Sequence, residues 1–434
     1  MLSGPLFCHA GASLASSQAC CARPVPEQVA PISLISDTLM PCWLTRNNAS
    51  RTLNFQGCGF FCADDQFLFV STYGMVPMIR FRSPAPAILL AACFLMSVSG
   101  SAKAEDNVAL EEGKHLSNIH QETSGFPRAG EGYFSPDGKW IVYQAYPVGY
   151  PFYQIYVQAT QDGVPRRISP GRGRTTCAYF SVDGKKILFA SAHVSDTLEK
   201  DEQQAREIEA RGGHRRYQWD FDPHMDIYAC NFDGTGLTRL TDASGYDAEG
   251  SYSHDGRFIV FTSSRDGDPD LYIMDADGKN VRQITNVPGY DGGPFFSPDD
   301  QWIIFRSDRQ QKDMLQLYAI SVDGKQEVQL TDDLNTVNWA PYFHPSGKYI
   351  IWARADYSRG PAGANFDLWT MDVTSTATTF KGGAVERITY HAKADVLPVF
   401  SPDGKQLLWT SNRGEGGTSQ LWIADWNRPE RSSR

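Results

Sequence analysis

Residues 134–139 read Phe-Ser-Pro-Asp-Gly-Lys, and variants of this phrase occur six times along the chain. The copies lie at 134–139, 180–185, 252–257, 296–301, 343–348 and 400–405. Measured from the Asp of each phrase, or from the Ser that replaces it in the fifth, successive copies are 46, 72, 44, 47 and 57 residues apart. A repeat in the forties that contains a tight turn is typical of one four-stranded blade of a β-propeller.

The third repeat shows the strands of one blade most clearly. An inner strand ends at 250–253, and alternating apolar residues predict further strands at 258–263, 270–275 and 281–285. Tight Asp-Gly turns follow the first and third of these strands. The outer strands of other repeats are expected at 166–169, 238–241, 328–331 and 386–389.

The sixth repeat ends after its third strand, at 419–426, and has no fourth strand of its own. Residues 115–121 precede the first inner strand and have the pattern of an outer strand. If they complete the last blade, the ring has no open edge. The sequence therefore predicts an all-β fold: a six-bladed β-propeller of four-stranded blades, closed by an N-terminal strand. The aromatic residue that opens each phrase is expected to pack between blades.

Residues 78–104 have the anatomy of a secretory signal peptide. Arg80 and Arg82 form a basic start, 85–98 is an uncharged apolar stretch too short to span a membrane, and Ala102-Lys-Ala104 is a cleavage site. Residues 105–434 are then the mature propeller, periplasmic or secreted, without a membrane span. The alternative is a lipoprotein anchored at Cys93, in Leu-Ala-Ala-Cys. Since signals act at the N-terminus, we interpret 1–77 as a disordered, non-native extension; a genuine extra domain is the alternative.

Composition restricts the partners and the redox chemistry. The net charge is −10, which argues against nucleic acid as a partner, because phosphate binding needs clustered Lys and Arg. Seven of the nine cysteines precede residue 105, which leaves Cys177 and Cys230. We expect these two to be buried free thiols, with a disulfide between them as the alternative.

The loops differ between the two faces of the predicted ring. Connections within the repeated phrases are tight, whereas those entering each inner strand and those between the second and third strands vary, and varied loops on a rigid scaffold carry binding sites. The largest insert, 193–219, contains a charged stretch, 196–211, that predicts a helix capped by Ser195. This helix is a charged decoration or a lid. Residues 214–217, His-Arg-Arg-Tyr, follow it as a basic and aromatic cluster.

Two sets of equivalent positions are expected to ring the channel mouth on this variable face. Eight residues before each marker stand Ala129, Thr175, Asp247, Asp291, Asn338 and Asp395, and six before stand Glu131, Cys177, Glu249, Gly293, Ala340 and Leu397. Their five carboxylates would attract a cation or a basic group; the alternative is that they cap turns. The predicted ligand-binding residues are Glu131, Arg172, Arg174, Asp247, Glu249, Asp291, Asn338, His391 and Asp395.

No linear motif assigns chemistry to this chain. The sequence has no nucleophile elbow, no His-Glu-x-x-His, no zinc-spaced cysteines and no phosphate-binding loop. Residues 266–270, Asp-Gly-Asp-Pro-Asp, have a spacing that calcium loops use, but they lack the downstream Gly and Glu. We therefore assign no catalytic residue, metal or cofactor.

The repeated Ser-Pro-Asp-Gly-Lys, followed by an aromatic third strand and an Asp-x-Asp-Gly turn, resembles the TolB-type propeller repeats over residues 112–426. The resemblance implies the propeller. TolB itself carries an α/β domain ahead of its propeller, and residues 105–130 are too few for that domain.

These observations favour a binding scaffold that holds a protein or peptide of the cell envelope on its variable face. The alternative is an enzyme, a lyase or hydrolase of an envelope polymer with its site at the channel mouth. It is suggested by the predicted Asp, Glu, Arg and His around that mouth.

Overall fold

The computed structural model describes residues 107–161, 163–211 and 221–428, and the backbone of four strands between residues 51 and 75. The chain divides into two units, 1–97 and 98–434. In the first unit, β1 (Arg51–Phe55), β2 (Cys58–Ala63), β3 (Gln66–Ser71) and β4 (Gly74–Met75) form an antiparallel sheet in sequence order. The expected signal peptide and Cys93 lie outside the described residues, and the origin of 1–77 stays a prediction.

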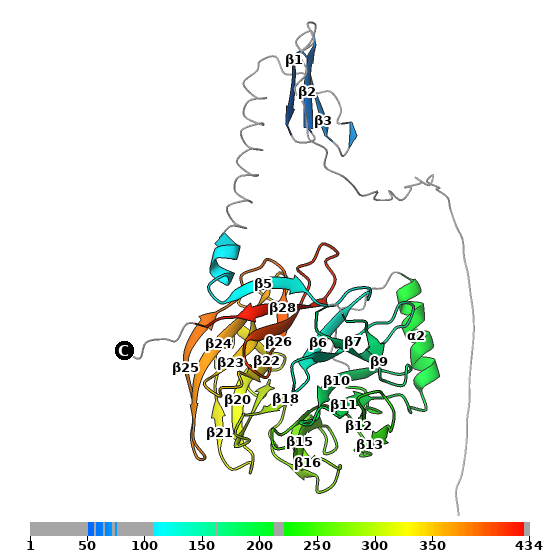
Figure 1. Cartoon of the computed structure of the whole chain (residues 1–434), viewed down its shortest axis with the longest axis vertical. Coiled ribbons are helices and arrows are strands. Elements are labelled where there is room, and N and C mark those ends of the chain that lie inside the picture. The colour runs from blue at the N-terminus through cyan, green and yellow to red at the C-terminus, as the bar shows by residue number, and fades with distance from the viewer. Residues whose placement is uncertain are drawn as a thin grey trace, which may run out of the picture. The chain divides into compact units, whose positions relative to one another are not determined.

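The second unit consists of six four-stranded antiparallel sheets, which Figure 1 shows arranged around a common centre. Blade 1 is β6 (Ala129–Phe134), β7 (Trp140–Ala145), β8 (Gln154–Ala159) and β9 (Arg166–Arg167). Blade 2 is β10 (Thr175–Phe180), β11 (Lys186–Ser191), β12 (Asp226–Asn231) and β13 (Thr238–Arg239). Blade 3 is β14 (Asp247–Tyr252), β15 (Phe258–Ser263), β16 (Asp270–Asp275) and β17 (Arg282–Gln283).

The remaining blades follow the same order from the centre outward. Blade 4 is β18 (Asp291–Phe296), β19 (Trp302–Ser307), β20 (Gln316–Ser321) and β21 (Glu327–Gln329). Blade 5 is β22 (Thr336–Phe343), β23 (Tyr349–Asp356), β24 (Phe366–Ser375) and β25 (Phe380–Arg387). Blade 6 is β26 (Asp395–Phe400), β27 (Gln406–Ser411), β28 (Gln420–Trp426) and β5 (Leu116–Gln121).

The last blade takes its outer strand from the beginning of the propeller. β5 pairs antiparallel with β28, and the two strands lie side by side in Figure 1. Every sheet therefore has four strands, as the missing strand of the sixth repeat required. The ring closes without leaving one blade short of an outer strand.

A hydroxyl group fastens the outer segment of every blade to its third strand. The backbone N–H of the second residue of that strand, or of the third in blade 5, donates to a Ser or Thr oxygen that follows the outer strand. The donor–acceptor pairs are Ile155–Ser169, Ile227–Thr241, Leu271–Thr285, Leu317–Thr331, Leu368–Thr389 and, in the closing blade, Leu421–Thr123. Four of the outer strands are only two or three residues long, and this bond holds the segment that follows each of them.

The aromatic residues that open the six phrases are all buried: Phe134, Phe180, Tyr252, Phe296, Phe343 and Phe400. They belong to apolar clusters that join residues of neighbouring blades, such as Phe296 of blade 4 with Val260 and Ile273 of blade 3. Burying a large side chain stabilises the fold by about 1.5–3 kcal/mol. These contacts explain why the six equivalent positions are aromatic. Cys177 and Cys230 are buried free thiols, as expected.

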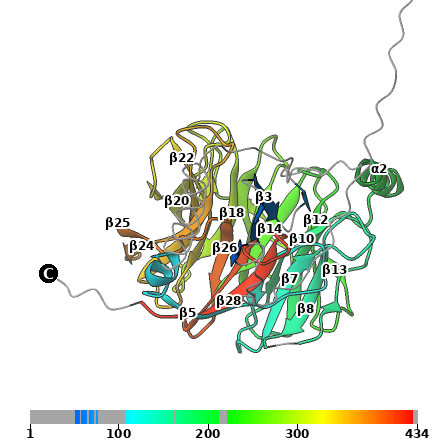
Figure 2. The ribbon, with the colours of Figure 1, turned by 90° about the horizontal axis from the view of Figure 1, so that it is seen from above.

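Two segments differ from the expected blade. In blade 5 the outer strand β25 begins at Phe380, six residues before the predicted start, because β24 extends to Ser375 and forms a longer hairpin with it. In blade 2 the insert contains helix α2 (Leu198–Ala210). Figures 1 and 2 both show α2 at the periphery of the ring, away from the central strands. Residues 214–217 lie outside the described residues.

The structure also bears on membrane association: within the described residues, no helix has the length and apolar character needed to cross a bilayer.

We predict that Thr123→Val weakens the closure of the ring. The substitution leaves the buried N–H of Leu421 without its acceptor and removes the hydroxyl that donates to Gln420, at 2.9 Å. A buried donor left unpaired costs about 1–3 kcal/mol. Urea denaturation should show this loss of unfolding free energy. The same substitution at the exposed Thr378 should show none, and an equal effect at both positions would contradict the role of Thr123.

Candidate functional site

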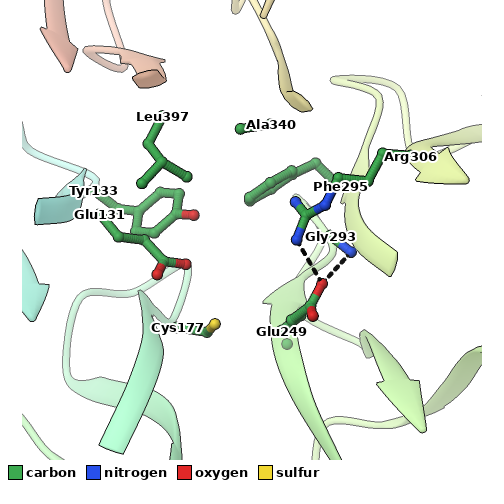
Figure 3. Close-up of a pocket in the computed structure, with 10 residues that line it drawn as sticks. Glu131, Tyr133, Cys177, Glu249, Gly293, Phe295, Arg306, Ala340 and Leu397 are labelled. Atoms are coloured by element: carbon green, nitrogen blue, oxygen red, sulfur yellow. Dashed lines mark hydrogen bonds and ion pairs between the residues drawn. The ribbon is translucent and has the colours of Figure 1, made fainter. Parts of the chain in front are cut away.

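All six inner strands carry a β-bulge at the same place, where the pairing register with the second strand shifts. The bulge residue has a left-handed backbone in every blade: Glu131, Cys177, Glu249, Gly293, Ala340 and Leu397, with φ between 47° and 59°. These are the six residues that stand six before the repeat markers, and all of them line one cavity on the propeller axis (Figure 3). Five of them are not glycine, and a left-handed conformation costs such residues about 1–2 kcal/mol each.

An aromatic plug closes the axis below this cavity. Tyr133, Tyr179, Phe295 and Tyr342 come from four different inner strands, and their ring centroids lie 5.0–6.3 Å apart. The hydroxyls of Tyr179 and Tyr342 are 3.2 Å apart. The inner strands begin at the variable face. In blade 1 the bulge residue Glu131 is the third residue of the strand, and the plug residue Tyr133 is the fifth. The cavity is therefore on the variable-face side of the plug.

One wall of the cavity is a saturated ion pair. The Glu249 carboxylate accepts hydrogen bonds from Arg306 (3.1 Å), from the Tyr290 hydroxyl (2.8 Å) and from the Tyr246 hydroxyl (3.2 Å). The backbone N–H of Gly293 donates to the same carboxylate (Figure 3). A Cβ at position 293 would overlap Nη1 of Arg306, so only glycine permits this approach. Because its charge is matched and its oxygens are bonded, Glu249 serves to fix Arg306 at the wall.

The opposite wall contains Glu131, a carboxylate that makes no ion pair within the described residues. Glu131 is 7% exposed, and no Lys, Arg or His in the described part of the chain forms an ion pair with it. Its side chain points into the cavity, near Tyr133 and Cys177 (Figure 3). Burial is the main cause that raises the pKa of Glu131 to about 7, and the Glu249 charge adds to the shift. A hydrogen bond from the Cys177 thiol and the charge of Arg306 oppose it. Glu131 therefore changes its charge near neutral pH.

The three ring aspartates are arranged differently. Asp247, Asp291 and Asp395 begin their inner strands, and each pairs with an arginine of its own blade: Arg265 at 3.0 Å, Arg309 at 2.5 Å and Arg413 at 2.6 Å. These carboxylates are buried. Burial raises the pKa of Asp247 and Asp291, and the arginines oppose that shift. The aspartates therefore join segments within a blade. Because each negative charge is neutralised by an arginine of the same blade, these carboxylates contribute little charge to the axial cavity.

The other predicted ligand-binding residues also lie away from the cavity. Arg174 pairs with Asp222 at 2.8 Å and stacks over Phe152, whereas Arg172 is exposed. Asn338 is buried and makes hydrogen bonds to Gln316 and Thr336 and from Trp352. His391 is partly buried, and its carbonyl accepts from Asn365. Of the nine predicted residues, the cavity brings together Glu131 and Glu249.

Sequence reasoning missed the arginines, although a signal was available. In three repeats an Asp opens the inner strand, and an Arg in the pattern Ser-x-Arg stands 18 residues later. The pairs are Asp247 and Arg265, Asp291 and Arg309, and Asp395 and Arg413. The repeats that lack the Asp also lack the Arg at this spacing. Tyr246 and Tyr290 stand at equivalent positions, directly before the Asp that opens the inner strand of the third and fourth repeats. Arg306 has no counterpart in the other repeats, and no pattern could have revealed that these three side chains meet.

The carboxylates at 266–270 make protein contacts. Asp266 accepts from Gln283, Asp268 from the backbone of Gly289, and Asp270 from Thr285. Among the described residues, no group of three or more His, Cys, Asp or Glu side chains is placed to hold a metal ion.

Residues 264–380 match the TolB β-propeller domain family. The matched stretch carries the repeated phrase, and the six closed blades extend its architecture to the whole ring. The protein is a TolB-like β-propeller. A stretch of 124 residues is 31% identical to the uncharacterized protein YidR of Escherichia coli (strain K12), and it covers 28% of this chain and 24% of that relative.

Several solved structures are similar to this TolB-like propeller. A protein assigned as TolB from Agrobacterium tumefaciens is 20% identical over 69% of this chain and 91% of its own, with a TM-score of 0.46. TolB from Acinetobacter baumannii is 18% identical over 87% and 79%, with a TM-score of 0.44. Oligogalacturonate lyase from Vibrio parahaemolyticus is 13% identical over 73% and 97%, with a TM-score of 0.42.

We predict that Asp291→Asn strongly destabilises the TolB-like propeller. It leaves the buried guanidinium of Arg309 with only Glu327 as a charged partner. Breaking a buried pair from one side costs roughly 3 kcal/mol. Denaturant unfolding measures the loss, and Asp277→Asn, which removes an exposed pair with Lys279, is the matched control and should change nothing measurable. Equal stabilities of the two variants would contradict a structural role for the ring aspartates.

We also predict a pH-dependent stability difference between wild type and Glu131→Gln. The pKa of Glu131 is about 7 in the fold and 4.5 in the unfolded chain, so the folded state holds its proton longer. Wild-type stability is therefore lost as pH rises from 4.5 through 7. Relative to wild type, the variant should gain roughly 2–3 kcal/mol between pH 5 and pH 8. Unfolding curves at both pH values test this, and a constant difference would refute it.

Proposed function

We propose that this TolB-like propeller is a binding scaffold of the cell envelope that holds a protein or peptide partner on its variable-loop face. The observation that carries the proposal is the blind axial cavity. Its lining includes the bulge residue of every blade, and the aromatic plug closes it on the side of the tight turns. A partner lying on the variable face would cover this cavity and could place one group in it.

An exposed side chain just after the insert supports the variable face as a contact surface. Phe221 is 43% exposed, and its ring packs against Tyr246 (5.2 Å between centroids) and Tyr290 (5.7 Å). Both tyrosine hydroxyls donate to Glu249 in the cavity wall. A partner that contacts Phe221 would therefore touch a group connected directly to the cavity. Exposed aromatic anchors of this kind are common centres of binding surfaces.

The envelope location rests on the predicted signal peptide at 78–104. A periplasmic or secreted protein is expected from cleavage after Ala104, and an anchored lipoprotein from lipidation at Cys93.

The enzymatic alternative has weaker support. A carboxyl with a pKa of about 7, such as that of Glu131, suits general acid–base catalysis. However, the cavity has a volume of about 20 Å³, which is room for about one water-sized group. A polymer unit would not reach Glu131, so we do not propose a lyase or hydrolase.

Two double variants test which face of the propeller binds the partner, and the substituted side chains on the two faces have similar exposed fractions. Phe221→Ala with Leu334→Ala removes apolar contacts on the variable face, where the residues are 43% and 41% exposed. Val182→Ala with Leu237→Ala does the same on the tight-turn face, at 44% and 39%. Partners cross-linked to the propeller in its own envelope fraction are then quantified by mass spectrometry. We expect the first pair to reduce specific partners at least tenfold and the second to leave them unchanged. The reverse pattern would overturn the proposal.

A further inference from the structure

The axial cavity contains one carboxylate, Glu131, that forms no ion pair with any described residue. Each of the other four ring carboxylates, Glu249 and the three aspartates, pairs with an arginine. Glu131 is equally buried and has no ion-pair partner in the described part of the chain. A buried carboxylate without a cation is costly unless a ligand supplies one.

The floor of the cavity also suits a cation. Tyr133 and Phe295 line it together, with ring centroids 5.7 Å apart, and Figure 3 shows both side chains at the edge of the same space as Glu131. Aromatic rings attract a cation placed near their faces, more strongly where water is excluded. The fixed pair of Arg306 and Glu249 on the opposite wall contributes charges that largely cancel.

Size restricts the kind of cation. About 20 Å³ holds one group of the size of a water molecule. A primary ammonium is that small, whereas a guanidinium or a quaternary ammonium is larger. The small or apolar side chains of Ala340 and Leu397 complete the wall and suit an unbranched methylene chain.

We propose that the axial cavity binds the primary ammonium group of a lysine side chain of the partner, with Glu131 as its counter-ion. This inference rests on the proposed function for the source of the lysine, but the site itself can be tested without the partner. A lysine carries its ammonium at the end of a thin, unbranched stem and can place that group alone in a space of this size, whereas the amine at a chain terminus is flanked by the wider peptide backbone.

The probe is n-butylammonium chloride, titrated into the full chain by calorimetry at constant ionic strength. Wild type should bind it, and glycinamide, which mimics a chain terminus, should bind at least tenfold more weakly. Tetramethylammonium and butanol should not bind. Glu131→Gln should lose at least tenfold in affinity, whereas Glu122→Gln, a carboxylate of similar burial (8% exposed) outside the cavity, should behave as wild type.

A second variant fills the space and keeps the charge. Ala340→Leu introduces a side chain that the equivalent position 397 already carries in the same backbone conformation. It should also abolish binding of butylammonium.

Affinity should rise about tenfold from pH 6 to pH 8, because the ammonium needs the ionised carboxylate. The groups that face Glu131 are Tyr133, Cys177, Glu249 and Arg306. Burial holds the pKa of the Tyr133 hydroxyl and of the Cys177 thiol well above their usual values, so neither ionises in this range.

No binding of butylammonium to wild type at 100 mM, or equal binding to Glu131→Gln, would overturn the inference. These outcomes are independent of the proposed function. If butylammonium binds through Glu131 but the variable-face variants keep all their partners, the ammonium site stands and the proposed binding face fails.

Discussion

The candidate site depends on one backbone constraint, the β-bulge that recurs in every inner strand. A regular strand would alternate its side chains between the two faces of its blade. The bulge residue adopts a left-handed conformation instead, and in all six blades it lines the axis. Five non-glycine residues accept this conformation, at a cost of about 1–2 kcal/mol each. The closed ring holds them there, since each inner strand packs between two neighbours and the last blade is completed by β5. Strain of this kind concentrates at functional sites.

Charge on the axis is then decided by which carboxylates have arginines. Three aspartates at the strand starts pair within their own blades, and Glu249 pairs with Arg306 across two blades. Such buried pairs gain little net stability, because desolvation offsets their attraction, but they fix side-chain positions. Among the ring carboxylates, Glu131 is buried and its pKa is raised to about 7. It occupies the blade 1 position at which blade 3 has the saturated Glu249. The asymmetry between these two positions gives the cavity its chemical character.

Most of the fold could be predicted from the sequence, because each blade corresponds to one copy of a repeated sequence pattern. The phrase at 134–139 and its copies gave the number of blades, and the missing strand after 419–426 indicated the closure by β5. The site could be predicted only in part. Counting residues from the marker placed Glu131 and Asp247 correctly on the inner strands, but it could not tell which side chain reaches the axis. Which side chain reaches the axis depends on the bulge, because the bulge interrupts the regular alternation of side chains between the two faces of the blade. Arg306 and Tyr290 come from neighbouring segments of blade 4, and their convergence on Glu249 is visible only in three dimensions.

The central claim is that Glu131 is buried beside the axis without an ion-pair partner among the residues that the structure describes. The most direct measurement is the titration of its carboxyl carbon by NMR in protein labelled with ¹³C-glutamate, with Glu131→Gln used to assign the resonance. The account predicts a midpoint near pH 7. A midpoint near 4.5, the value of an ordinary glutamate, would mean that the carboxylate is solvated or paired, and the account of the axial cavity would be wrong.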